Sequence, residues 1–170
     1  ARLPDRDLHK ASPRQQKPTA DDSQMVREVV KPFFQEHIGY VPGLRFYDMP
    51  YLALVHKGVL YLNLRLLRAP PQETAQQRAE RIKAIKVVLF DEAISLKYPA
   101  LSDDEVLTQY TIPYAILNDA LPALLKLLKD AGVSSNDPTY KIIKFYVYHS
   151  AWWDFIRGRL EEFTRSLDYM

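Results

Sequence analysis

The feature that most constrains the fold is a long helical pattern at the end of the chain. Asn136, Asp137 and Pro138 are typical helix-start residues, and the pattern that follows them runs to about Leu167. At about 100° per residue, its large apolar side chains gather in one broad arc, which we expect to face the core. The arc consists of Ile142, Phe145, Tyr146, Trp152, Trp153, Ile156, Leu160, Phe163 and Leu167. His149 lies in its middle, where a histidine is more often a hydrogen-bonded packing residue than a ligand.

Part of the opposite side of this helix is also apolar. Tyr148, Ala151 and Phe155 follow the i, i+3, i+7 spacing of a helix face and lie outside the arc. Because aromatic residues are enriched at the centre of protein interfaces, we expect Tyr148 and Phe155 to bind a partner protein. The alternative is that the N-terminal tail or the segment 40–66 of the same chain folds over this strip.

Helix-start and helix-stop residues predict further helices upstream. A first helix is expected after the N-cap candidates 21–23, with a kink at Pro32 and an end at Gly39. A long helix is expected between the proline pair 70–71 and Tyr98, just before the next proline. The apolar face predicted for it comprises Ala75, Ala79, Ile82, Ile85, Leu89, Ala93 and Leu96.

Two shorter helices are expected between residues 100 and 135. Ser102 and Glu105 have the spacing of a capping box, which opens the first of them. Asn118 or Asp119 is the predicted N-cap of the second, which Gly132 ends. Pro122 lies in the first turn of this second helix. Its apolar side is one leucine stripe, Leu121, Leu124, Leu125 and Leu128.

The segment 52–66 is ambiguous. Alternate residues are leucine from Leu60 to Leu66, and Gly58 precedes them, which favours a β-hairpin. A helix suits the leucine-rich composition nearly as well. The predicted fold is therefore mainly α, an irregular multi-helix bundle with a small β-hairpin near 52–66 and an extended N-terminal arm. Residues 1–20 are expected to form the arm and residues 21–170 a single helical domain.

The arm cannot build a core of its own. It has three prolines, seven charges and two leucines, too little apolar surface to offset the entropy of ordering the backbone. We expect a neighbouring protein chain to hold it, and the alternative is that the body of the same chain does so. The partner-binding residues predicted in the arm are Arg2, Leu3, Arg6, Leu8, Arg14 and Lys17.

The arm also carries the positive charge of the chain. Residues 1–20 hold five cations and two anions, and the whole chain has a net charge of +2, so residues 21–170 sum to −1. A nucleic-acid-binding body usually presents a clustered basic face, so nucleic acid is not an expected partner. No uncharged run approaches the length of a membrane span.

The sequence contains no catalytic or cofactor-binding signature. Its four histidines lie in four separate regions, its five glycines are dispersed, and it has no cysteine. The acidic clusters 91–92 and 103–105 look like a solvated helix face and a first-turn match to the helix dipole. We therefore expect no enzyme activity, no cofactor and no metal.

These observations favour a non-catalytic structural or accessory subunit of a large assembly, anchored to other protein subunits of a hetero-oligomeric complex by its arm and its aromatic helix. The same helix is of a type that lies on membranes, with Lys141, Lys144 and Arg157 near anionic lipid headgroups. We expect a peripheral protein of the mitochondrial inner membrane, in an ATP synthase or a respiratory complex. A start at Ala1 is compatible with a removed presequence, signal peptide or initiator Met. The alternatives are an RNA-associated subunit, such as a mitochondrial ribosome component, and a processed bacterial exported protein-binding module.

Overall fold

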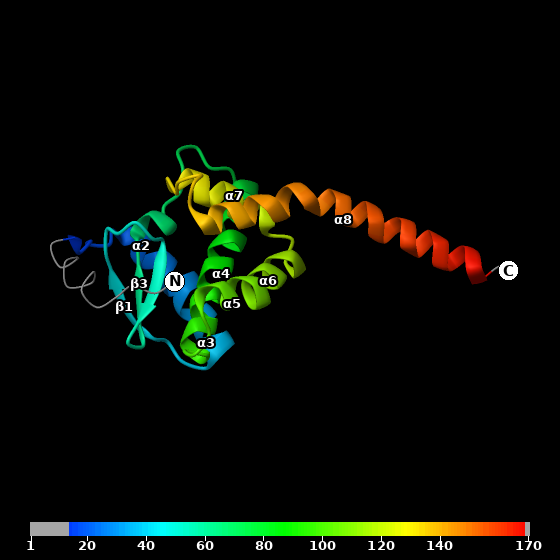
Figure 1. Ribbon diagram of the computed structural model, residues 1–170. Helices are drawn as coiled ribbons and strands as arrows, with labels where there is room; N and C mark the ends of the chain where they lie inside the picture. The colour runs from blue at the N-terminus through cyan, green and yellow to red at the C-terminus, as the bar shows by residue number, and fades with distance from the viewer. Residues whose placement is uncertain (1–13, 169–170) are drawn as a thin grey trace.

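The computed structural model describes the backbone of residues 14–168 and, in the last helix, the side chains of residues 138–149, 158, 159, 161, 162 and 164–166. The described chain is mainly helical with one small mixed sheet, as predicted. Helices α2 and α3 lie on one side of the sheet, α4 runs through the middle of the body, and α8 leaves the body (Figure 1). In chain order the elements are α2 Ala20–Met25, η2 Val26–Val30, α3 Lys31–Ile38, β1 Gly43–Phe46, β2 Ala53–His56, β3 Val59–Leu62, η3 Leu64–Leu66, α4 Ala75–Lys97, α5 Asp103–Val106, η4 Leu107–Thr111, α6 Ile112–Leu117, α7 Leu121–Asp130 and α8 Pro138–Asp168.

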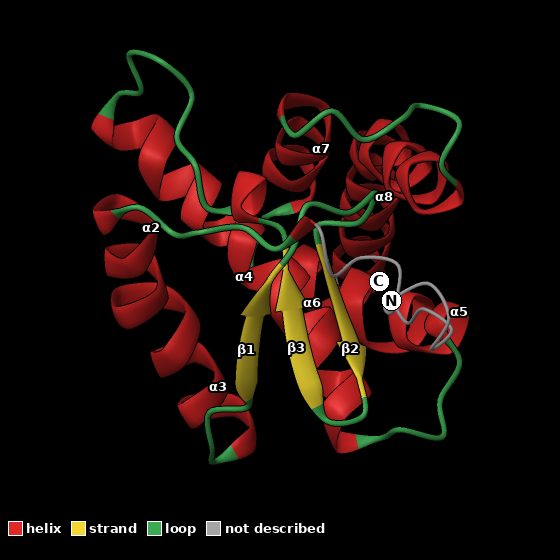
Figure 2. Ribbon diagram, turned by 90° about the vertical axis from the view of Figure 1, so that its left-hand side faces the viewer, coloured by secondary structure: helices red, strands yellow, loops and turns green. Residues whose placement is uncertain are grey.

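The predicted hairpin is present as β2 and β3. These strands pair antiparallel, and Lys57 and Gly58 connect them with positive φ angles of 48° and 75°, which suit the right-handed twist of a hairpin. The sequence pattern missed β1, which pairs parallel to β3 and gives the strand order β1-β3-β2 (Figure 2). The leucine alternation also continues past the sheet, because Leu64–Leu66 form the 3-10 helix η3 and are not strand.

The described end of the arm lies against the sheet of the same chain. The Asp48 N–H donates to the Arg14 carbonyl at 2.8 Å, and the Gln16 N–H donates to the Phe46 carbonyl at 2.9 Å. The side-chain oxygen of Gln16 accepts from the Leu64 N–H at 2.8 Å. This part of the arm therefore lies along the outer edge of the sheet, next to the end of β1. For these residues the structure favours the second of the two predictions, that the body of the same chain holds the arm.

The first helix starts earlier than its predicted caps. Thr19 is the N-cap of α2, and its hydroxyl and the Asp22 carboxylate form a reciprocal capping box, so the N-cap prediction at 21–23 is wrong. Sequence alone does not separate Thr19 from the polar run behind it. Arg14 and Lys17 are exposed, whereas Arg2, Leu3, Arg6 and Leu8 lie outside the described residues. The division into an arm and a single domain stays a prediction.

Two prolines widen their helices without ending them. Pro32 is the second residue of α3 and follows the π-helical turn η2, and Pro113 occupies the same place in α6 after η4. A proline cannot donate to the carbonyl four residues earlier, and its ring crowds that carbonyl, so a wider turn before it relieves both problems. The kink predicted at Pro32 is thus a π-helical turn, and the helix ends at Gly39 with φ 81° as expected.

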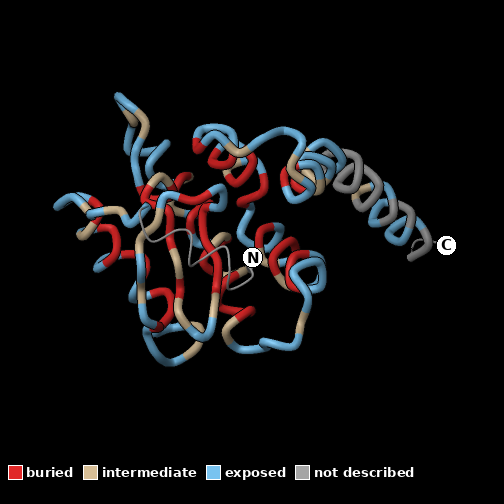
Figure 3. The backbone as a smooth tube through the Cα atoms, turned by 60° about the vertical axis from the view of Figure 1, so that its left-hand side comes forward, coloured by how far each residue is buried: buried red, intermediate tan, exposed pale blue. Residues whose placement is uncertain are grey.

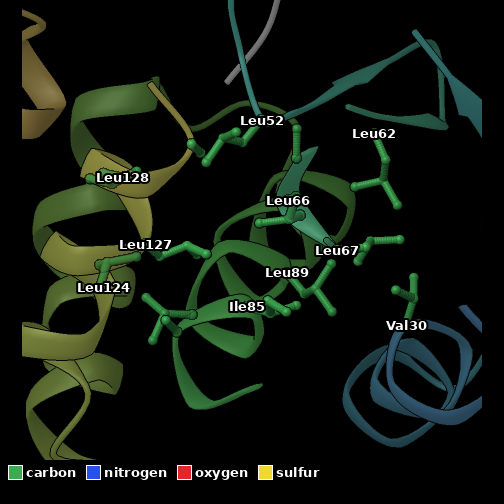
Figure 4. Packing of buried hydrophobic residues seen from close by; sticks show 14 of the residues in the cluster. Val30, Leu52, Leu62, Leu66, Leu67, Ile85, Leu89, Leu124, Leu127 and Leu128 are labelled. Atoms are coloured by element: carbon green, nitrogen blue, oxygen red, sulfur yellow. The ribbon is translucent and has the colours of Figure 1, made fainter. Parts of the chain in front are cut away.

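The core forms around α4. Ile85 and Leu89 of α4 lie between leucines of α7 on one side and Val30 of η2 on the other (Figure 4). The predicted face of α4 is confirmed at Ile85, Leu89 and Ala93, which are buried, but Ala75 and Ala79 are exposed. The reason is that the buried residues of α4 begin at Arg81, so the face that carries Ala75 and Ala79 in its first turns is not covered.

Helix α7 supplies the other side of this core. Its predicted leucine stripe, Leu121, Leu124, Leu125 and Leu128, is buried. The cap prediction is wrong, because Ala120 is the N-cap and offers no side-chain acceptor. Asn118 ends α6 instead, where its amide donates to the Tyr114 carbonyl at 2.8 Å. Gly132 follows α7 with φ 78°, the left-handed conformation expected of a helix stop.

Candidate partner-binding helix

Helix α8 has 31 residues and is the longest described element. The Asp137 carboxylate accepts from the N–H groups of Thr139 and Tyr140 at 2.9 and 3.2 Å, which caps the predicted start. Only the first turns pack on the body, mainly against α7. The rest extends away from the body (Figure 1). The residues after Tyr148 number about 20, which corresponds to roughly 30 Å of helix at a rise of about 1.5 Å per residue.

A narrow face attaches α8 to the body. Tyr140 and Ile143 are buried, with 5% and 2% of their surface exposed, and Val147 is partly buried. Ile142 and Tyr146 also pack partly against the core. Beyond Val147, every α8 residue whose burial the structure describes is exposed or intermediate (Figure 3).

The predicted core arc of this helix is confirmed in part at Ile142 and Tyr146, which pack partly against the core, and is wrong at Phe145 and His149. Phe145 is 55% exposed, and His149 is exposed as well. The physical reason is that α8 packs mainly against one helix, α7, which covers a stripe narrower than the apolar arc. The side chains of the other arc members, Trp152, Trp153, Ile156, Leu160, Phe163 and Leu167, lie outside the described residues.

The exposed aromatic side chains of α8 stabilise one another locally. The Phe145 ring stacks on His149 with 4.1 Å between centroids and meets Tyr146 edge-on at 5.7 Å. Nδ1 of His149 lies 2.7 Å from the Phe145 carbonyl, so the histidine is hydrogen-bonded, as predicted, but on the surface. These contacts hold the rings in place and leave their outer faces to solvent.

The predicted partner and lipid residues lie along the same stretch. Tyr148 is 65% exposed, and Nζ of Lys144 lies 5.7 Å from the centroid of its ring, within the range of a cation–π contact. Lys141 is exposed too. Phe155 and Arg157 belong to α8, but their side chains lie outside the described residues. Their roles in binding stay predictions.

Two ion pairs lie where α2, η3 and the start of α4 meet. Buried Arg81 donates to both carboxylate oxygens of buried Glu73, at 2.6 and 3.1 Å, and to the Leu67 carbonyl at 3.0 Å. Arg68 pairs with Asp22 at 3.1 Å. Burial opposes ionisation of Asp22, but hydrogen bonds from Arg68 and Thr19 outweigh it and lower the pKa of this carboxyl. The sequence analysis did not predict these two ion pairs, because their partners do not form a recognisable motif.

Two hollows flank these ion pairs, with volumes of about 410 and 490 Å³, and both are lined by Arg68, Ala69 and Arg81. Arg68 and Arg81 are engaged by carboxylates of the same chain, and Lys126 at the rim is engaged by Asp130 at 2.7 Å. The arrangement therefore fastens the loop before α4 to the body, and we assign the hollows no ligand.

One buried acid has a strongly perturbed pKa. Glu92 of α4 is almost completely buried, and burial, with the neighbouring charge of Asp91, raises its pKa to about 7. Acidic pairs of this kind can serve as catalytic acids. Here the second carboxylate, Asp91, accepts from the Thr111 hydroxyl at 2.7 Å, which ties α4 to η4. We interpret the pair as part of the packing of α4.

The histidines do not form a metal site in the described part of the chain, where no group of three His, Asp or Glu side chains could hold an ion. His37 lies in an aromatic cluster with Phe33, Phe90 and Tyr114, 4.1 Å from the ring of Phe33. Within residues 14–168, no helix combines the length and the apolar character needed to cross a bilayer. No family model, curated protein or solved structure matches the chain.

Proposed function

We propose that the chain is a non-catalytic accessory subunit of a hetero-oligomeric assembly and that α8 is its partner-binding element. The observation that carries the proposal is a long helix that leaves the body while presenting Phe145 and Tyr148 to solvent. Exposed aromatic residues grouped on one element are a common mark of protein interaction sites.

Helix energetics support the same proposal. Most of the stability of a helix in a protein comes from packing of its amphipathic face and not from the helix propensity of its residues. The projecting part of α8 is helical and rich in large apolar residues, and its backbone extends away from the body (Figure 1). A partner subunit would supply that packing.

The proposed location is the surface of the mitochondrial inner membrane, in an ATP synthase or a respiratory complex. What supports it is the combination of an aromatic helix with Lys141, Lys144 and Arg157 along it and a body without basic excess. The RNA-associated alternative has less support, since the only clearly positive segment of the sequence is the arm.

The proposal is tested by the size of the particle that contains the chain. Full-length tagged protein and a variant lacking residues 150–170 are expressed in cells of the source organism, and mild extracts are separated by sedimentation. We expect the full chain in a large particle and the truncated chain as a free small protein. A full chain that sediments alone would contradict the proposal.

Point variants localise the anchor within the full chain. Replacing the exposed Tyr148 with Ser is expected to reduce incorporation into the particle, and Phe155→Ser is expected to do the same. Tyr51→Ser is the matched control, since Tyr51 is an exposed tyrosine on the body. Equal losses for the control and the α8 variants would show that α8 is not the anchor.

A further inference from the structure

The apolar positions of α8 repeat with a period that has a specific structural meaning. From Ile142 to Leu167 they are separated by four and three residues in strict alternation. The positions are Ile142, Tyr146, His149, Trp153, Ile156, Leu160, Phe163 and Leu167, which we call the heptad seam. A mean spacing of about 3.5 residues keeps such a row facing one partner helix when two helices supercoil.

The heptad seam does not coincide with the face that attaches α8 to the body. At about 100° per residue, its centre lies roughly 150° around the helix from Tyr140, Ile143 and Val147. Exposure agrees with this placement, because His149 of the seam is exposed while Ile143 is buried. Of its described members, Ile142 and Tyr146 pack partly against the body and His149 is exposed, so the seam positions after Tyr146, on the part of α8 that leaves the body (Figure 1), are those we expect a second chain to cover.

The charges beside the heptad seam have one sign. In the projecting half, the positions that flank a coiled-coil seam contain two charged residues, Arg157 and Arg159, and no acid. The acids of this half, Asp154, Glu161, Glu162 and Asp168, fall at positions farther from the seam. Arg159 makes an ion pair with Glu162 at 3.6 Å, and both side chains are more than half exposed. Such an exposed pair contributes little, so a partner carboxylate can share the guanidinium.

We propose that the projecting half of α8 forms a coiled coil with an amphipathic helix of another protein, one that carries Glu or Asp beside its own apolar seam. This inference rests on the proposed function and adds the class of partner. Pairing with a second copy of this chain fits less well, because no carboxylate of α8 flanks the heptad seam to meet Arg157 and Arg159. Acidic flanks on a different helix match both arginines.

The test uses the full chain and two synthetic helical peptides of about four heptads. Both have Ile and Leu at the seam positions, and they differ in carrying either Glu or Lys at all flanking positions. We expect the chain to bind the Glu peptide on the order of tenfold more tightly than the Lys peptide, because two attractive pairs become two repulsive ones. Titration calorimetry at low salt and at about 0.5 M salt should show this preference shrinking as the salt rises.

Matched variants of the full chain separate the seam from the rest of the helix. Leu160→Glu places a charge in the heptad seam and should abolish binding of both peptides, whereas Arg165→Glu, which introduces the same side chain away from the seam, should leave binding unchanged. Arg159→Glu should remove the preference for the Glu peptide. Arg165→Glu makes the same change of charge six residues further on, outside the flanking positions, and should keep the preference. Circular dichroism of each variant checks that the chain is folded.

Several results would overturn the inference. Binding of neither peptide, or equal binding of both, would exclude an acidic coiled-coil partner. A dimer of the full chain that Leu160→Glu dissociates would assign the heptad seam to a second copy. Retention on vesicles of anionic phospholipid that Leu160→Glu abolishes would assign it to a membrane. If the chain binds neither peptide but still needs residues 150–170 to enter its particle, the proposed function stands and only this partner class fails.

Discussion

The two longest helices of the molecule, α4 and α8, have similar apolar content and opposite surroundings. Helix α4 is enclosed by α3, α7 and β2, so that even Arg81, Glu92 and Ser95 are buried on it. Helix α8 packs on α7 through its first turns and then leaves the body. The difference shows that helical spacing identifies which residues share a face. It does not tell whether the same chain or another chain covers that face, which only the tertiary structure can show.

The largest expected effect comes from the ion pair that fastens the start of α4. Arg81→Met leaves the buried Glu73 carboxylate and the Leu67 carbonyl without their donor. We expect a loss of about 3–5 kcal/mol in unfolding free energy, as is usual when one member of a buried pair is removed. Urea denaturation measures it, with Lys83→Met on the exposed side of α4 as the control. A loss below about 1 kcal/mol would mean that the pair does not hold the loop to α4.

The next effect compares two neighbouring residues of α8. Ile143 is buried against the body, so Ile143→Ala should cost about 2–4 kcal/mol. Phe145→Ala, two residues away, should cost less than about 1 kcal/mol, because more than half of that side chain is already exposed. Denaturant midpoints of the two variants decide the matter. Equal losses would mean that both sides of α8 are covered within the chain.

A smaller, pH-dependent effect is expected at Glu92. In the unfolded chain this carboxyl ionises near pH 4.5, and in the folded chain near pH 7. Between these values the folded state binds more protons, so its contribution to stability is fully present below about pH 4.5 and is lost as the pH rises through about 7. The change is on the order of 1–3 kcal/mol.

Glu92→Gln supplies the check on this titration. The variant should lose the part of the pH dependence that falls between about pH 4.5 and pH 7, so the stability difference from the unaltered chain should change across that range. Asp104→Gln, at an exposed acid, serves as the control. Parallel pH profiles for the unaltered chain and Glu92→Gln would contradict a raised pKa.

Much of the fold could be predicted from local signals. Gly39, Gly58 and Gly132 stand where the chain turns or a helix stops, and each has a positive φ angle. Strand β1 was missed although Leu44 and Phe46 alternate with Gly43 and Arg45, because four residues are too few to separate a strand from the turn before them and its partner β3 lies across intervening chain. Non-local pairing of this kind leaves no pattern within a short window of sequence.

The candidate site was predicted only in part. The sequence identified α8 and its aromatic residues, but it assigned the broad apolar arc to the core of the same chain. The strict four-three spacing from Ile142 to Leu167 was the available signal, because a helix packed on a globular core has no need for a 3.5-residue period. Tyr140 and Ile143, which pack α8 against the body, are not among the positions of this four-three repeat.

The central claim is that the projecting half of α8 takes its packing from another chain. Deleting residues 150–170 and measuring the unfolding free energy of the isolated protein in urea tests this claim most directly. The account predicts a value within about 1 kcal/mol of the full chain, since the residues removed follow the last part of α8 that packs on the body. A loss of about 3 kcal/mol or more would show that the body itself uses this half of the helix, and would contradict the account.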